Sequence, residues 1–230
     1  SIARTVSARS LLNDIADATW QCADPGIQFD TVINDWHTCP GDGRINASNP
    51  CSEYMFLDDT ACNLASLNLM KFFNPEPCRV DIDGYLHAVR LWTLTLEISV
   101  AMAQYPSRAI ARNSYLFRTL GLGCANLGAL LMVMGLPYDS RQGRNMAAAL
   151  MAIMTGAAYR TSAELSQEQG PFPRFGDNRE SMLRVIRNHR RAAYAESPEN
   201  YEGLHIPPVP LDPAFCPDYV FQAARRQWDE

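Results

Sequence analysis

Residues 43–69, GRINASNPCSEYMFLDDTACNLASLNL, decide the fold of this 230-residue chain. They include the end of a loop over 34–50 that is rich in Asn, Asp, Gly and Pro. Loops longer than about 12–15 residues without secondary structure are uncommon and often functional. We expect a strand at 53–57, a turn, and a second, mostly buried segment at 62–73. The pattern therefore predicts a functional loop between extended segments.

The loop ends in a tip that places chemically useful side chains two residues apart. If the tip is extended, alternate residues point to the same side, so Asn49, Cys51 and Glu53 share a face while Pro50 stiffens the chain. A carboxamide, a thiol and a carboxylate would then face one substrate. Spacing alone favours the alternative, which is a turn with an incidental cysteine.

Outside this segment the sequence is mainly helical. Apolar residues recur at three- and four-residue spacings over 81–104, which predicts a long helix. A strand is expected at 27–33, and a short strand with a glycine-bounded helix at 118–137. The remaining expected helices cover 8–22, 140–168, 177–194 and the stretch from 218 onward, with a break at 170–175 and an ordered, proline-rich meander at 197–217.

Composition excludes several classes of protein. The apolar fraction of 47% supports a real core in one large domain or two small ones. A net charge of −5 argues against direct DNA binding, which needs a basic face. The longest apolar run, Leu127–Met134, falls short of the ~18 residues of a membrane span, and no hydrophobic signal opens the chain. Seven cysteines without an export signal predict reduced thiols in a cytoplasm.

Three weaker patterns carry little functional information. Cys51 and Cys62 are too far apart in sequence for a zinc knuckle, so we expect no metal site. The run GLGCANLG at 121–128 has the wrong glycine spacing for a dinucleotide-binding turn, and close backbone packing explains it better. The arginine-rich stretch 184–191 is more typical of a solvated helix face than of a phosphate site. No histidine is assigned a role.

Taken together, the motifs resemble one family. GRINASNPCSEYMFLDDTACNLASLNL is similar to the catalytic loop of the adenosylcobalamin-dependent (class II) ribonucleotide reductases. The similarity continues upstream through ADPGIQFDTVINDWHTCP and downstream through RTLGLGCANLGALLMVMGLPYDS and GPFPRFGDNRESMLRVIRNHR. Essentially the whole chain looks like one contiguous central piece of such an enzyme.

The resemblance implies a role for each residue of the motif. Cys51 matches the cysteine that becomes a thiyl radical, and Glu53 matches the general base. Asn49 matches the amide that orients the sugar, and Ser48 lies beside it in the substrate-binding stretch. Cys62 matches one of the two cysteines that form a disulfide during turnover. The cofactor implied is adenosylcobalamin, and the substrate is a ribonucleotide, either a diphosphate or a triphosphate.

The family fold is a ten-stranded α/β barrel with the catalytic loop inserted through its centre. For residues 1–230 we expect a helix-rich part of that barrel, with the finger loop at about 46–57. The second redox cysteine is expected before residue 1 and the substrate phosphate loop beyond residue 230, so the chain is expected to be a split-gene, processed or excised piece. Expected partners are the missing segments of the same reductase, an external dithiol such as thioredoxin, and a second copy in a homodimer.

Two alternatives stay open at this point. One is a non-catalytic structural or interaction fragment of a split or processed reductase. The other is a piece of a reductase from another class, which uses a different radical source. Loss of activity on changing Cys51 would distinguish catalysis from a structural role, and a requirement for cobalamin would distinguish the classes.

Overall fold

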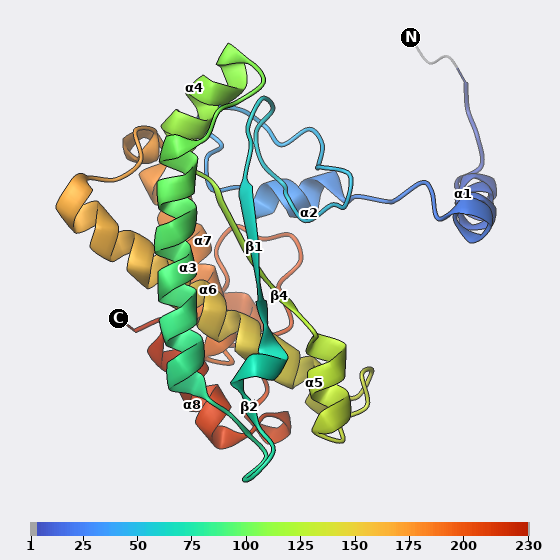
Figure 1. Cartoon of the computed structure of the whole chain (residues 1–230). Helices are drawn as coiled ribbons and strands as arrows, with labels where there is room; N and C mark the ends of the chain where they lie inside the picture. The colour runs from blue at the N-terminus through green and yellow to red at the C-terminus, as the bar shows by residue number, and fades with distance from the viewer. Residues whose placement is uncertain (1–3, 230) are drawn as a thin grey trace.

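A long helix, α6 (Arg141–Gln169), runs through the centre of the computed structural model, which describes residues 4–229 (Figure 1). Its side chains Met146, Leu150 and Ile153 are fully buried. Helices α3 (Ile82–Met102) and α8 (Asp218–Arg226) pack against it. Burial of these apolar faces supplies the main stabilisation of the fold.

The helices begin where the sequence provides a capping side chain. Asp81 accepts a hydrogen bond from the Gly84 N–H at the start of α3. Serines do the same for α4 (Arg108–Phe117) and α6, where Ser107 and Ser140 are the capping residues. Such caps satisfy backbone N–H groups that have no partner inside the helix.

Two parallel strands lie against this helical layer. Strand β1 (Asn63–Asn68) pairs with β4 (Leu120–Ala125), with Asn63 opposite Leu120 and Asn68 opposite Ala125. The chain passes from one strand to the other through η1 (Leu69–Phe72), the antiparallel pair β2 (Phe73–Asn74) and β3 (Arg79–Val80), α3 and α4. Within residues 4–229 neither outer edge of the β1–β4 pair is paired with another strand.

The arginines of α7 (Phe175–Ala193) hold the proline-rich meander in place. Arg184 donates to the carbonyl oxygens of Glu202 and Gly203, and the Glu202 carboxylate pairs with Arg187 and Arg191. These side chains are therefore engaged within the protein, so the 184–191 stretch packs against the meander instead of forming the simple solvated helix face that the sequence suggested. The meander contains η2 (Pro198–Asn200) and η3 (Pro213–Phe215), and the remaining helices are α2 (Asp30–Asp35) and α5 (Leu127–Val133).

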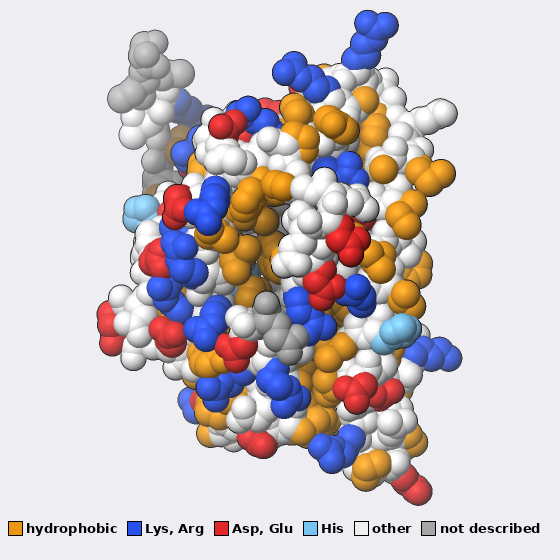
Figure 2. All heavy atoms as spheres, turned by 90° about the vertical axis from the view of Figure 1, so that its left-hand side faces the viewer, with side chains coloured by type: hydrophobic (Ala, Val, Ile, Leu, Met, Phe, Trp, Pro, Cys, Tyr) orange, Lys and Arg blue, Asp and Glu red, His pale blue; other side chains and the backbone are white. Residues whose placement is uncertain are grey.

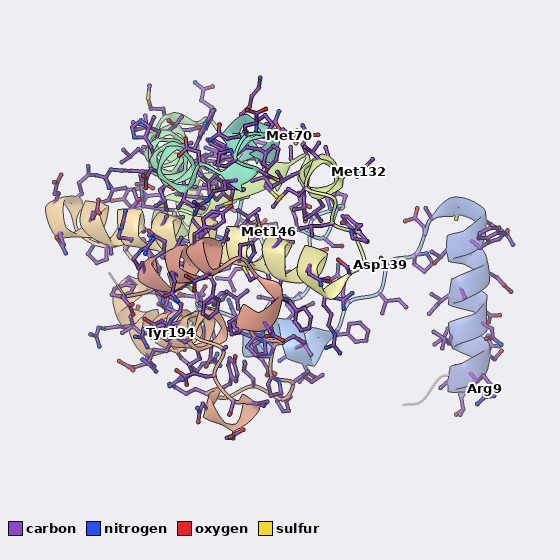
Figure 3. All side chains as sticks on the ribbon, turned by 90° about the horizontal axis from the view of Figure 1, so that it is seen from below. Arg9, Met70, Met132, Asp139, Met146 and Tyr194 are labelled. Carbon is purple, nitrogen blue, oxygen red and sulfur yellow. The ribbon has the colours of Figure 1, made fainter. Side chains whose placement is uncertain are left out.

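Helix α1 (Ala8–Cys22) stands apart from the rest of the molecule, as Figures 1 and 3 both show. None of its residues is buried, and Trp20 is 91% exposed. By contrast, Met146 lies in the middle of the body in the view of Figure 3. None of the helices among the described residues is long and apolar enough to cross a membrane.

Several predicted elements differ from the structure. The expected strand at 27–33 is instead extended chain followed by α2, and residues 53–57 form no strand beyond one isolated bridge at Met55. Helix α4 was not predicted. Strand β1 is not mostly buried, since Leu64 is 66% exposed. The strand at 120–125 and the helices at 8–22, 82–102 and 141–169 confirm the predictions there.

The described residues do not show the expected ten-stranded barrel. Residues 4–229 contain the parallel pair β1–β4 and the antiparallel pair β2–β3, whose strands have two residues each. They do not close a ten-stranded barrel. A closed barrel needs every strand to pair on both sides, and β1 and β4 each pair on one side only in the described part of the chain.

Candidate functional site

The tip of loop 46–57 is a tight hairpin turn. Ser48 and Met55 form an isolated antiparallel bridge at its base. Nearer the tip, the Asn49 N–H donates to the Tyr54 carbonyl oxygen at 3.4 Å, and the Ser52 N–H donates to the Asn49 carbonyl oxygen at 3.0 Å. Ser52 has a φ of 63°, in the left-handed region. A four-residue turn that ends on a left-handed residue is a common way to close a hairpin.

The prediction that the tip is extended is therefore wrong. Residues 49–52 turn back on themselves, so the two-residue alternation of an extended chain does not apply to them. Cys51 and Glu53 are nevertheless both exposed at this end of the loop, and Asn49 is half-buried beside them. The turn, which spacing alone favoured, carries all three side chains.

The two ends of the Asn49 carboxamide have different environments. Its Oδ1 accepts a hydrogen bond from the Tyr54 N–H at 3.0 Å, which braces the turn. Its Nδ2 has no hydrogen-bond partner among residues 4–229. The oxygen is thus committed to the loop, while the amide nitrogen keeps two donors for a ligand.

Ser48 is tied into the same turn. Its hydroxyl donates to the Asn49 carbonyl oxygen at 2.8 Å and lies 3.3 Å from the Ser52 hydroxyl. Gln28 donates from Nε2 to both serine hydroxyls, at 3.1 Å for Ser52. No sequence pattern marked Gln28 as a partner of the tip, because it falls in the segment predicted to be a strand. Ser48 supports the tip, and its contact with substrate stays a prediction.

Cys62 lies just before β1 and is half-buried. Burial raises the pKa of its thiol, and the negative charge of Glu53 raises it further. The fold therefore brings the Glu53 carboxylate close enough to the Cys62 sulfur to act on its protonation. Gly121 packs against this sulfur, since a methyl group there would lie 2.7 Å from Cys62 Sγ. Close backbone packing thus explains the glycine at 121.

Cys62 forms no disulfide with another cysteine of the described chain in this structure. All seven are free thiols in the described part of the chain. Cys39 and Cys216 are buried, and burial raises the pKa of each to about 11. Cys124 lies on β4 opposite Leu67. Leu67 is five residues after Cys62, so the two cysteines are separated by roughly 16 Å along the strand direction.

The arrangement supports a limited set of reactions. An exposed thiol at Cys51 and a carboxylate at Glu53 occupy one loop tip, with a second thiol at Cys62 within electrostatic range of the carboxylate. Hydrogen-atom or electron transfer at sulfur and proton transfer at the carboxylate are the chemistries that these groups provide. The described residues hold no cluster of three or more His, Cys, Asp or Glu side chains suited to a metal ion.

A cavity of about 680 Å³ lies behind the loop rather than around its tip. The arm of the loop at Tyr54, Met55 and Phe56 forms one wall, and α3, α4, β4 and α6 supply most of the others. Figure 2 shows a hollow with hydrophobic side chains on the helical face of the molecule. None of Asn49, Cys51, Glu53 or Cys62 lines this cavity, so the candidate reactive groups lie outside it.

Comparison with known proteins identifies what the chain is similar to. The family described as "Ribonucleotide reductase, barrel domain" matches residues 1–230. A vitamin B12-dependent ribonucleotide reductase of Agrobacterium fabrum is 60% identical over 230 residues, which is 100% of this chain and 18% of that protein. One of Bradyrhizobium diazoefficiens is 58% identical over 229 residues, with 99% and 18% covered.

A more distant relative is the vitamin B12-dependent ribonucleoside-diphosphate reductase of Mycobacterium tuberculosis. It is 34% identical over 178 residues, which is 77% of this chain and 25% of that protein. The chain thus spans about a fifth of the length of the relatives that it matches, 18% for the first two.

Proposed function

Because the chain belongs to the ribonucleotide reductase family, as its match over residues 1–230 shows, we propose that it carries the catalytic loop of a vitamin B12-dependent ribonucleotide reductase. The reaction proposed is reduction of ribonucleotides to 2′-deoxyribonucleotides by thiyl-radical chemistry. One observation carries this proposal. An exposed thiol and carboxylate share a loop tip, and a second thiol, Cys62, lies within electrostatic range of that carboxylate.

Each residue has a distinct part in the proposed reaction. A radical at the Cys51 sulfur removes the 3′ hydrogen atom of the ribose, because S–H and C–H bonds have comparable strengths. Glu53 accepts the proton of the 3′ hydroxyl, and the 2′ hydroxyl takes up a proton from the reducing thiols and leaves as water. The free Nδ2 of Asn49 hydrogen-bonds the sugar and holds the reacting atoms in place, with Ser48 supporting the tip.

Cys62 is proposed as half of the reductant. With a second thiol from outside residues 1–230, it gives up two electrons and two protons and becomes a disulfide, which an external dithiol such as thioredoxin reduces again. The raised pKa keeps the Cys62 sulfur as a thiol at neutral pH, so its hydrogen is available to the substrate.

The proposed cofactor is adenosylcobalamin, after the names of the relatives, and it supplies the radical when bound. Radical transfer from the cofactor requires access to the Cys51 sulfur. The Cys51 thiol is exposed, so a group can approach it from outside the chain. Corrin nitrogens already surround the cobalt, so the lack of a metal-ligand cluster among residues 4–229 is compatible with such a cofactor.

We propose that residues 1–230 are a partial catalytic barrel domain, with the finger loop at 46–57. The open edges of β1 and β4 support this, since strands from elsewhere in the enzyme can pair with them. We therefore expect activity to require the further segments of a longer reductase, in a complex that includes a homodimer. Free thiols throughout the described chain fit a reducing compartment, and we propose the cytoplasm.

The test is formation of deoxynucleotide from ribonucleoside diphosphates and triphosphates, with adenosylcobalamin and a dithiol present. It is run on the lone chain and on the complete reductase polypeptide that contains it. We expect product only from the complete protein, and we expect Cys51→Ala to reduce it by at least about 10³-fold, the scale seen when a reacting group is removed. Cys22→Ala, which removes an exposed thiol of α1, is the matched control.

Equal activity of the Cys51→Ala and Cys22→Ala proteins would contradict the proposal. That result would favour the alternative of a non-catalytic structural or interaction fragment. Product formation without added cobalamin would instead favour a reductase with another radical source.

A further inference from the structure

Tyr54 directly follows Glu53, and its hydroxyl is anchored away from the tip. The Tyr54 OH lies 2.9 Å from the Thr60 Oγ1 and 3.1 Å from the Thr119 Oγ1. Both threonines use their own protons elsewhere: Thr60 donates to the Leu57 carbonyl oxygen and Thr119 to the Ala61 carbonyl oxygen. Both oxygens can therefore accept the Tyr54 proton.

These contacts join three parts of the chain that are separate in sequence. Tyr54 belongs to the loop, Ala61 is the residue before Cys62, and Thr119 is the residue before β4. The parallel register then fixes Thr119 relative to β1, because Leu120 pairs with Asn63. The hydroxyl of Tyr54 is thus tied to the backbone on either side of Cys62.

The backbone of Tyr54 is tied to the tip at the same time. Its N–H donates to Asn49 Oδ1 at 3.0 Å, and its carbonyl oxygen accepts from the Asn49 N–H. One residue therefore connects Asn49 through its main chain and the surroundings of Cys62 through its side chain. Burial raises the pKa of the Tyr54 phenol, so it keeps the proton that it donates.

We propose that Tyr54, with Thr119 as its anchor, is a positioning residue that sets the placement of the loop tip relative to Cys62. Its meaning for catalysis rests on the proposed function, whereas the geometric statement can be tested without any turnover. A residue that only packed would behave differently. Tyr54 does contact the Phe56 ring, with centroids 6.1 Å apart, and phenylalanine would preserve that contact.

The test compares variants that differ by one hydroxyl group. Tyr54→Phe removes the hydroxyl and keeps the ring, and Tyr138→Phe is its control, since Tyr138 is 70% exposed and has no hydrogen bond from its hydroxyl among the described residues. Thr119→Val removes one of the two oxygens that can accept the Tyr54 proton, together with the hydrogen bond to the Ala61 carbonyl oxygen, with little change in shape, whereas Thr119→Ser keeps both.

The readout is the rate at which iodoacetamide alkylates Cys62 in the native 230-residue chain, followed by peptide mass spectrometry from pH 7 to pH 10. Glu53 is the titratable group whose charge raises the pKa of this thiol, and the Cys62 sulfur in turn raises the pKa of Tyr54. If the tip is released, the Cys62 side chain becomes more exposed to solvent and the Glu53 carboxylate moves away. The pKa of the Cys62 thiol then falls. Each pKa unit raises the thiolate fraction about tenfold below the pKa.

We expect Tyr54→Phe and Thr119→Val each to speed alkylation of Cys62 by about threefold or more at pH 7.5, because even half a unit of pKa has this effect. Tyr138→Phe and Thr119→Ser should stay near the parent rate. In the complete reductase, Tyr54→Phe should lower kcat and leave the KM for substrate nearly unchanged, with Thr119→Ser again close to the parent.

The proposal is overturned if Tyr54→Phe and Thr119→Val both unfold cooperatively yet alkylate at the parent rate. If Tyr54→Phe fails to fold, the Thr119→Val and Thr119→Ser pair decides the matter alone. Failure of the proposed function is a separate result, because it shows itself as full activity of the Cys51→Ala reductase whatever the alkylation rates are.

Discussion

Replacement of Gly121 by alanine tests how closely β4 must approach the strand that follows Cys62. A methyl group at this position would lie 2.5 Å from Leu64 Cδ2, 2.7 Å from Cys62 Sγ and 2.9 Å from the Asn63 carbonyl oxygen. The Leu64 side chain is largely exposed and can rotate away. The Asn63 carbonyl oxygen belongs to the paired strand and cannot move without disturbing β1.

The size of the effect follows from these contacts. Overpacking of a well-packed site costs about 1–3 kcal/mol, and a clash with backbone leaves little room for relaxation. We expect Gly121→Ala to lower the free energy of unfolding by about 2–3 kcal/mol, which is a factor of roughly 30 to 150 in the folded-to-unfolded ratio.

Gly123 provides a matched control two residues along the same strand. A methyl group there would meet its nearest neighbour, the Ser66 Oγ, at 3.8 Å, an ordinary contact. Gly123→Ala should therefore leave stability unchanged or raise it by up to about 1 kcal/mol, through loss of chain entropy in the unfolded state.

Urea unfolding followed by circular dichroism measures the free energy of unfolding of both variants. A Cys62→Ala/Gly121→Ala double variant separates the clash with the sulfur from the clash with the Asn63 carbonyl oxygen. Cys62→Ala removes the sulfur but leaves the Asn63 carbonyl oxygen in place, so Gly121→Ala should cost less in that background without becoming neutral. Equal unfolding free energies for the Gly121→Ala and Gly123→Ala chains would refute the close approach of the two strands.

Two further predictions concern the segments around the loop. Asn178 is buried, accepts from the Gly41 N–H at 2.9 Å and donates to Asp42 Oδ2 at 2.6 Å, while Arg174 holds the other Asp42 oxygen. Asn178→Leu removes both of these hydrogen bonds and should cost about 1–3 kcal/mol in urea unfolding, and a loss below about 0.5 kcal/mol would contradict this. The hydrogen bond from Arg187 lowers the pKa of Glu202 from 4.5 to about 2, so the stability that this carboxylate adds is complete above pH 4.5 and is lost as the pH falls towards 2. Glu202→Gln should be less stable at pH 7 and lose less on acidification, and parallel stability–pH curves for the two chains would count against the ion pair.

The sequence nominated candidate reactive groups, but it did not predict how they are arranged. The N-P-C-S-E motif and Cys62 were sufficient to name the family and to nominate Asn49, Cys51 and Glu53. The long helices were predictable too, because apolar spacing reports burial of one helix face. The prediction for 27–33 was wrong. Its β-branched and aromatic residues favour a strand, but in the structure Phe29 is 70% exposed and α2 begins at Asp30.

Contacts between residues far apart in the sequence determine the geometry around the loop tip and Cys62. Gln28 reaches the serines of the tip, Thr119 anchors Tyr54, and Gly121 makes room for the Cys62 sulfur. No local pattern marks these partners, because each depends on how two separate segments approach in space. The sequence by itself therefore determined the family and the candidate reactive groups, since both depend on residue types along a short motif. Only the tertiary structure decided where those groups stand, since strand pairing and side-chain hydrogen bonds over long separations fix their positions.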